Sequence, residues 1–94
     1  MANNLAFNPW ILDTAAATTV KAGRTRVAGF IFRGYVAAAN KAIVQDTKRS
    51  LIIAEMFGNA GLTPVGVDFG SKGQWVQDLA LTTLDAGQVE VLVL

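Results

Sequence analysis

The 94-residue sequence contains no cysteine and no histidine, and both absences narrow its chemistry. Without cysteine the chain can form neither a disulfide nor a thiolate metal site. Without histidine it lacks the commonest general base and the commonest zinc ligand in proteins. Enzyme classes that depend on either side chain are therefore excluded.

Charged residues are scarce as well. Asp, Glu, Lys and Arg make up 16% of the chain, whereas globular proteins average about 25%. The net charge is only +1, which gives no electrostatic basis for binding nucleic acid or an anionic membrane. A small domain with so little surface charge can bury part of that surface between subunits. The alternative is a monomer covered by Ala, Thr and Gln.

Long hydrophobic runs are also missing. The longest apolar run, Val27 to Phe32, has six residues, far short of the roughly 20 that span a bilayer. The first basic residue is Lys21, so we expect no secretory signal at the start of the chain. We expect no membrane partner.

The pattern of the last 22 residues, Gly73 to Leu94, predicts two strands joined by a tight turn. Asp and Gly at residues 84–87 favour turn geometry, and valines alternate with other residues from Val89 onward. The second strand ends apolar on both faces, because Leu92 and Leu94 lie opposite the valines. Such an end needs cover on both sides, from a second layer or another subunit.

The longest strand candidate is Thr25 to Val36, which is apolar on both faces and therefore belongs in the centre of a sheet. Gly29 and Gly34 within it indicate a bulge or a close approach of another backbone. Just before it, residues 22–24 contain a glycine and predict a turn.

Residues 36–57 fit two interpretations. A charged tetrad at residues 46–49 separates two clusters of β-branched residues, which favours strands at Ala42–Gln45 and Leu51–Phe57. A helix would instead suit Ser50 as its N-cap and Gly58 as the residue after its last turn. We favour the strands.

Turn signals recur at roughly 8–15-residue intervals, as in antiparallel β proteins. We predict an all-β fold, an antiparallel β-sandwich that is jelly-roll-like or a small barrel, with about 7–8 strands. A single domain at residues 10–94 follows an extended arm at residues 1–9. Leu5 and Phe7 of this arm face the same way when the backbone is extended, and Trp10 is the first anchor of the domain.

The search for chemistry finds no site. The seven carboxylates show no informative spacing, and Asp46 and Asp85 fall in predicted turns, where Asp serves the backbone. No calcium loop, phosphate-binding loop or dinucleotide fingerprint is present. We predict no catalytic, cofactor-binding or metal-binding residue and a protein that is not an enzyme.

The basic residues form two groups, Lys41 with residues 48–49 and Arg24 and Arg26 with Arg33. We interpret them as solvated turns. Their functional interpretation is salt bridging to an acidic patch on a partner protein.

A resemblance to a known class of proteins rests mainly on two stretches, IFRGYVAAANKAIVQDTKRSLI and WVQDLALTTLDAGQVEVLVL. The chain resembles small structural proteins of tailed bacteriophage particles, of the decoration or cement type that binds the outside of a capsid, and related head-fibre or tail accessory proteins. The likeness runs from about Asp13 to Leu94 and is one of composition and cadence, without a diagnostic motif, so no site residue is carried over. It implies a β-sandwich or jelly roll that trimerises on the capsid surface of a virion.

The expected partners are therefore further copies of the chain, with a trimer as the expected state, and a major capsid protein or another virion protein. The residues expected at an oligomer or partner interface are Leu5, Phe7, Trp10, Leu92 and Leu94. An alternative is a carbohydrate-binding β-sandwich that stacks sugars on Trp10, Tyr35 or Trp75.

Overall fold

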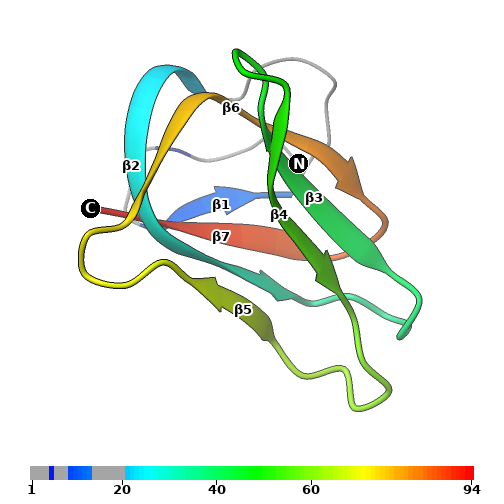
Figure 1. The fold of residues 1–94 in the computed structure, drawn as a ribbon. Coiled ribbons are helices and arrows are strands. Elements are labelled where there is room, and N and C mark those ends of the chain that lie inside the picture. The colour runs from blue at the N-terminus through cyan, green and yellow to red at the C-terminus, as the bar shows by residue number, and fades with distance from the viewer. Residues whose placement is uncertain (1–4, 6–8, 14–20) are drawn as a thin grey trace.

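The computed structural model describes residues 5, 9–13 and 21–94, and its regular structure in these ranges is entirely β-strand (Figure 1). The strands are β1 (Trp10–Leu12), β2 (Lys21–Arg33), β3 (Lys41–Asp46), β4 (Leu51–Phe57), β5 (Val65–Asp68), β6 (Gln74–Leu84) and β7 (Gln88–Val93). Every pairing between them is antiparallel. The predicted fold class is confirmed: the described part of the chain is all-β, with seven strands in a small sandwich-like or barrel-like arrangement.

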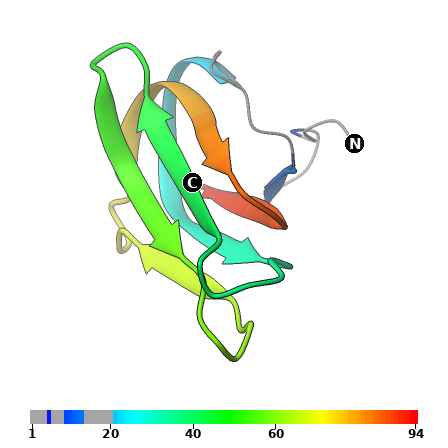
Figure 2. The ribbon, with the colours of Figure 1, turned by 90° about the vertical axis from the view of Figure 1, so that its right-hand side faces the viewer.

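The sheet runs in the order β1-β7-β2-β6-β3-β4, and β5 pairs with β2 away from this path. The first half of β2, up to Val27, pairs with β6, whereas its second half pairs with β7 and β5. β2 therefore belongs to both layers, and the sheet folds over at this strand. Figures 1 and 2 show β6, β3 and β4 on one side and β1 and β7 on the other.

The prediction that β2 is central and irregular at Gly29 is confirmed. The register slips between Val27 and Gly29, so that Val27 and Phe30 both point into the core. A Cβ atom at Gly29 would overlap the carbonyl oxygen of Val67 in β5. Glycine is thus required where β5 approaches the bent strand.

The bounds of β2 correct two other predictions. Residues 22–24 continue the strand instead of turning the chain, because the positive φ of Gly23 (84°) is absorbed in a second bulge opposite β6. At the other end the strand stops at Arg33, so Val36 lies in the following loop and is exposed.

The strand interpretation of residues 36–57 is confirmed by β3 and β4, which pair from Lys41–Phe57 to Asp46–Leu51. The prediction that Asp46 lies in the turn itself is wrong, although its carboxylate does accept from a backbone N–H of that turn, that of Arg49. Asp46 is the last residue of β3, its side chain is fully buried, and the turn occupies residues 47–50.

The predicted terminal hairpin is also wrong, although both of its strands form. β6 pairs with β2 and β3, and β7 pairs with β1 and β2, so the two strands lie in different layers. Each already has two hydrogen-bonded neighbours, and residues 85–87 connect the layers. Gly87 permits this connection, because its φ is 79° and a Cβ atom there would overlap the backbone of Arg33 and Tyr35.

The core lies between the layers. Val89 and Val91 of β7 are fully buried, and Val93 is partly buried and packs against the same core. Phe30 meets Phe69 edge-on, with ring centroids 5.7 Å apart, and Phe32 stacks on Tyr35 at 4.7 Å. The described ranges contain no helix long and apolar enough to cross a membrane.

Of the predicted arm, Leu5 and Pro9 are among the described residues. Leu5 is partly buried and packs against the core of its own chain. The other interface residue predicted there, Phe7, lies outside the described residues.

Candidate functional site

Trp75 is a large exposed aromatic side chain on β6, with 44% of its surface accessible. Gly73, with φ 69°, leads into the strand, and the alternation of a strand then points Trp75 outward and Val76 into the core. The prediction of Trp75 as a strand residue is confirmed, and its side chain belongs to the surface.

Two arginines of β2 lie against this ring. Arg26 is the direct cross-strand partner of Trp75, and Arg24 is two residues away on the same face. The guanidinium carbon lies 4.2 Å from the ring centroid for Arg24 and 5.9 Å for Arg26. Each exposed contact of this kind is worth about 0.5–1 kcal/mol, enough to favour one rotamer of Arg24 over the ring.

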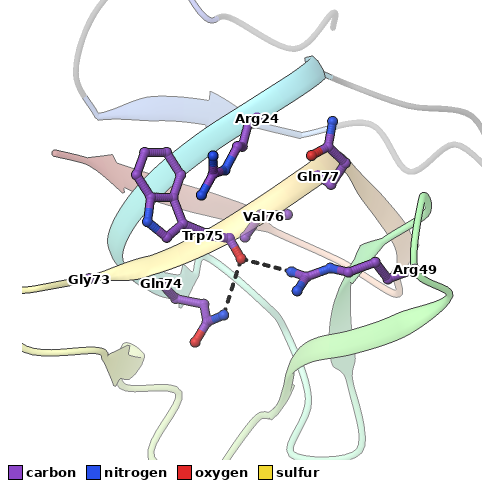
Figure 3. A pocket seen from close by; sticks show the side chains of 7 residues that line it. All are labelled: Arg24, Arg49, Gly73, Gln74, Trp75, Val76 and Gln77. Carbon is purple, nitrogen blue, oxygen red and sulfur yellow. Dashed lines mark hydrogen bonds between the residues drawn. The ribbon is translucent and has the colours of Figure 1, made fainter.

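A third arginine approaches from the opposite side of the strand. Arg49, in the turn between β3 and β4, donates from a terminal nitrogen to the main-chain oxygen of Trp75 at 3.0 Å (Figure 3). Gln74 donates to the same oxygen at 3.1 Å. The backbone of Trp75 is thereby fixed by side chains from two segments.

Buried Asp46 holds Arg49 in place. Its carboxylate accepts from Nε of Arg49 at 2.7 Å and from the backbone N–H groups of Arg49 and Gln77 at 2.9 and 2.8 Å. Burial by itself raises the pKa of a carboxyl group, but these donors and the positive charge of Arg49 outweigh it and hold the pKa of Asp46 below its usual range. Asp46 is therefore ionised at neutral pH and links the turn to β6.

A second carboxylate fixes the register of the arginines. Asp78 of β6 has a φ of 54°, and its Oδ1 accepts from the N–H of Gly23 at 2.7 Å. Gly23 and Asp78 form the bulge between Lys21 and Arg24. The bulge sets which face Arg24 occupies, and thus brings it over the Trp75 ring.

Two hollows flank this ring. The first, of about 420 Å³, is lined by Arg24, Arg49 and the polar side chains of Gln74 and Gln77. The second, of about 480 Å³, shares Arg24 and Trp75 with the first. Its apolar lining includes Trp10, Val93 and Leu94, and its basic lining is Lys21, Arg24 and Arg26. We call the set Trp10, Lys21, Arg24, Arg26, Arg49 and Trp75 the cationic aromatic surface.

The structure brings together two of the predicted interface residues, Trp10 and Leu94, in the second hollow. Leu92 lies apart from them, in a hollow of about 320 Å³ that Gly29 and Gly66 also line. Their role at an interface stays a prediction.

Of the three aromatic rings in the carbohydrate-binding alternative, Tyr35 is not accessible to a sugar. Tyr35 is buried, stacks on Phe32, and uses its hydroxyl to bond Thr63 and Asn59. Trp10 packs against the core, and Trp75 carries Arg24 over its ring. No ring of the three is an open platform on both faces.

The predicted grouping of the basic residues is corrected. Arg33 pairs with Glu90 at 3.1 Å, and Lys41 lies at the end of β3 remote from Arg49. Arg24, Arg26 and Arg49 gather around Trp75 instead. The sequence signal was the alternation in Arg24-Thr25-Arg26, which puts both arginines on one strand face, but nothing in it indicates Trp75 or Arg49 as neighbours.

A second surface is apolar. Of seven large apolar side chains that are exposed among the described residues, five lie on β4 or in the loops near its ends. We call this set the apolar β4 surface; it consists of Leu51 and Ile52 at the start of β4, Phe57 at its end, and Val36 and Leu62 in loops. β4 ends the strand order, with β3 as its hydrogen-bonded neighbour.

Within the described ranges, no three Asp or Glu residues lie close enough together to hold a metal ion. No family model, curated protein or solved structure matches the chain.

Proposed function

We propose that this protein is a non-enzymatic structural protein of a tailed-bacteriophage virion, which oligomerises and binds the outer face of the capsid as a decoration or cement protein. The observation that carries the proposal is the apolar β4 surface. An edge strand with exposed Leu51, Ile52 and Phe57 is a poor surface for a protein that stays alone in water. The resemblance of the sequence to phage structural proteins supplies the setting.

The occupant of the apolar β4 surface is a further copy of the chain. Natural edge strands avoid pairing by carrying lysine, proline or bulges. β4 carries one bulge, at Ile53, and one charged residue, Glu55, but neither lysine nor proline. Identical subunits carry identical apolar surfaces, so that self-association covers them pairwise or around a closed ring. We expect a trimer, because a trimer engages three equivalent sites of a capsid lattice at once and multiplies weak contacts through effective concentration.

Light scattering on the purified chain tests the self-association. The expected mass is about three times 9.9 kDa. Ile52→Lys places a charge in the exposed edge and should shift the protein toward the monomer. Ser71→Lys adds the same charge to an exposed turn away from β4 and should leave the mass unchanged. A monomer at every concentration of the unmodified chain would refute this part of the proposal.

Sedimentation with capsids tests the setting. The chain is mixed with undecorated capsids of the phage whose genome encodes it, and occupancy is measured in the pellet. Saturation at a fixed ratio to the major capsid protein is the expected result. Binding to tails or fibres without binding to capsids would instead assign the chain to the head-fibre or tail accessory proteins.

A further inference from the structure

Most of the positive charge on the cationic aromatic surface has no ion-pair partner among the described residues. The two ion pairs among the described residues are Arg33–Glu90 and Arg49–Asp46. Lys21, Arg24 and Arg26 have no carboxylate partner in that part of the chain, although they line one hollow together. In a protein with so few charges, three such cations lining one hollow with a tryptophan need a reason.

The arginines are arranged to bind before any ligand arrives. Arg24 lies over the Trp75 ring, and Nε of Arg26 donates to the main-chain oxygen of Lys72. A guanidinium in such a position keeps terminal N–H groups at its periphery, in the planar fork that fits a carboxylate. These contacts reduce the side-chain entropy that is lost on binding, which favours affinity.

The hollow beside these arginines is amphipathic. Trp10, Val93 and Leu94 supply apolar lining, and Lys21, Arg24 and Arg26 supply the cations. A ligand that fits must offer an apolar group and a carboxylate at neighbouring positions. Extended polypeptide does so when acidic and bulky apolar residues follow one another.

We propose that the cationic aromatic surface binds an extended acidic segment of another protein, with a carboxylate on Arg24 and Arg26 and an apolar side chain in the hollow between Trp10 and Trp75. The inference rests on the proposed function in that an assembly protein has a protein partner, but it uses a surface distinct from the apolar β4 surface.

Single-stranded nucleic acid is the competing ligand, because it also combines negative charge with groups that stack on tryptophan. Two observations favour the peptide. The net charge of +1 is low for a nucleic-acid-binding domain, and Arg24 already lies over the Trp75 ring on which a base would stack. The competing ligand is therefore one arm of the test.

The test uses the full chain and a fluorescently labelled peptide, Glu-Leu-Glu-Leu-Glu, with binding measured by fluorescence anisotropy at low salt. The control peptide carries glutamine in place of each glutamate. The site variants are Arg24→Gln with Arg26→Gln, and Trp75→Leu. The matched control is Lys41→Gln with Lys48→Gln, which removes the same charge from outside the surface.

We expect each site variant and the glutamine peptide to weaken binding at least tenfold, and the control pair to change it less than twofold. Equal losses in the site and control pairs would reduce the effect to net charge and overturn the proposal, as would equal binding of the glutamine peptide. Tighter binding of labelled oligothymidylate, lost in the same variants, would assign the surface to nucleic acid. If the variant with both arginines replaced unfolds at a lower temperature than the native protein, the single variant Arg24→Gln is compared with the controls instead.

The variant Ile52→Lys separates this inference from the proposed function. It should bind the acidic peptide with unchanged affinity even when it no longer self-associates. Loss of peptide binding in Ile52→Lys would show that the site forms only between subunits and would overturn the assignment to a single chain.

Discussion

Replacing Asp46 with asparagine removes one negative charge from a fully buried position while keeping the side-chain shape. In the native protein the carboxylate accepts from two backbone N–H groups and from the Arg49 guanidinium. Asparagine keeps one acceptor oxygen and turns an NH₂ group toward the remaining donors. Breaking a buried ion pair costs about 3–5 kcal/mol, but Arg49 is about half exposed, so water screens part of the loss. We expect a loss of about 2–3 kcal/mol in unfolding free energy.

The loss should depend on pH in one direction. The pKa of Asp46 is lowered in the folded protein, so its stabilising contribution is complete above the unfolded pKa, about 3.9. The contribution disappears as the pH falls through the folded pKa. The difference in stability between the native protein and Asp46→Asn should therefore be full at pH 7 and shrink steadily below about pH 4.

Urea denaturation at a series of pH values measures this difference. Asp68→Asn is the control, because Asp68 is exposed and accepts from the N–H of Gly70, a bond that asparagine can also accept. The control should stay within about 0.5 kcal/mol of the native protein. A difference for Asp46→Asn below about 0.5 kcal/mol at pH 7, or one that persists unchanged at pH 2, would refute the account of Asp46 as an ionised clamp.

Three further changes test the fold. Gly87→Ala should lower the unfolding free energy by more than about 2 kcal/mol, because a Cβ atom there overlaps backbone. Gly70 has the same φ of 79° but open space around it, so Gly70→Ala should cost only about 1–2 kcal/mol, and thermal melts compare the two variants. Tyr35→Phe removes the hydroxyl that bonds the loop at Thr63 and should cost about 1–2 kcal/mol, and an unchanged melting temperature would contradict this. Deletion of residues 89–94 removes the middle of a layer and should give an unfolded or insoluble chain; a native-like circular dichroism spectrum would count against it.

The parts of the fold that could be predicted from the sequence are those that depend on local pattern. The doubly apolar run in β2 indicated a central strand, and the charged residues between two β-branched clusters indicated β3 and β4. Gly29 indicated a bulge or close contact, because a glycine inside a strand serves few other purposes.

The errors concern choices that local pattern does not determine. Gln74–Leu84 and Gln88–Val93 have the alternation and the connecting turn of a hairpin, yet each pairs with other strands. Asp46 follows the predicted strand Ala42–Gln45 and precedes polar residues, as a turn aspartate would. The N–H of Gln77, which its buried carboxylate accepts, lies 31 residues away. Pairing partners and long-range donors belong to the tertiary structure.

The cationic aromatic surface could be predicted in part. The sequence groups Arg24 and Arg26, although together with Arg33 and as solvated turns, and it predicts Trp10 and Leu94 as interface residues. These residues lie together around Trp75 because of the bulge at Gly23 and the pairing of β2 with β6. A single sequence contains no signal for that register.

The place of β7 between β1 and β2 has a consequence for synthesis. Trp10–Leu12 can join the sheet only through residues 89–91, and the second half of β2 gains one of its two neighbours from the same strand. A nascent chain that lacks residues 88–93 thus exposes β-strand edges and apolar core on the layer that β7 completes. Because contacts between distant segments form slowly, this layer closes late, and the unfinished chain is the form that most needs protection from aggregation by chaperones.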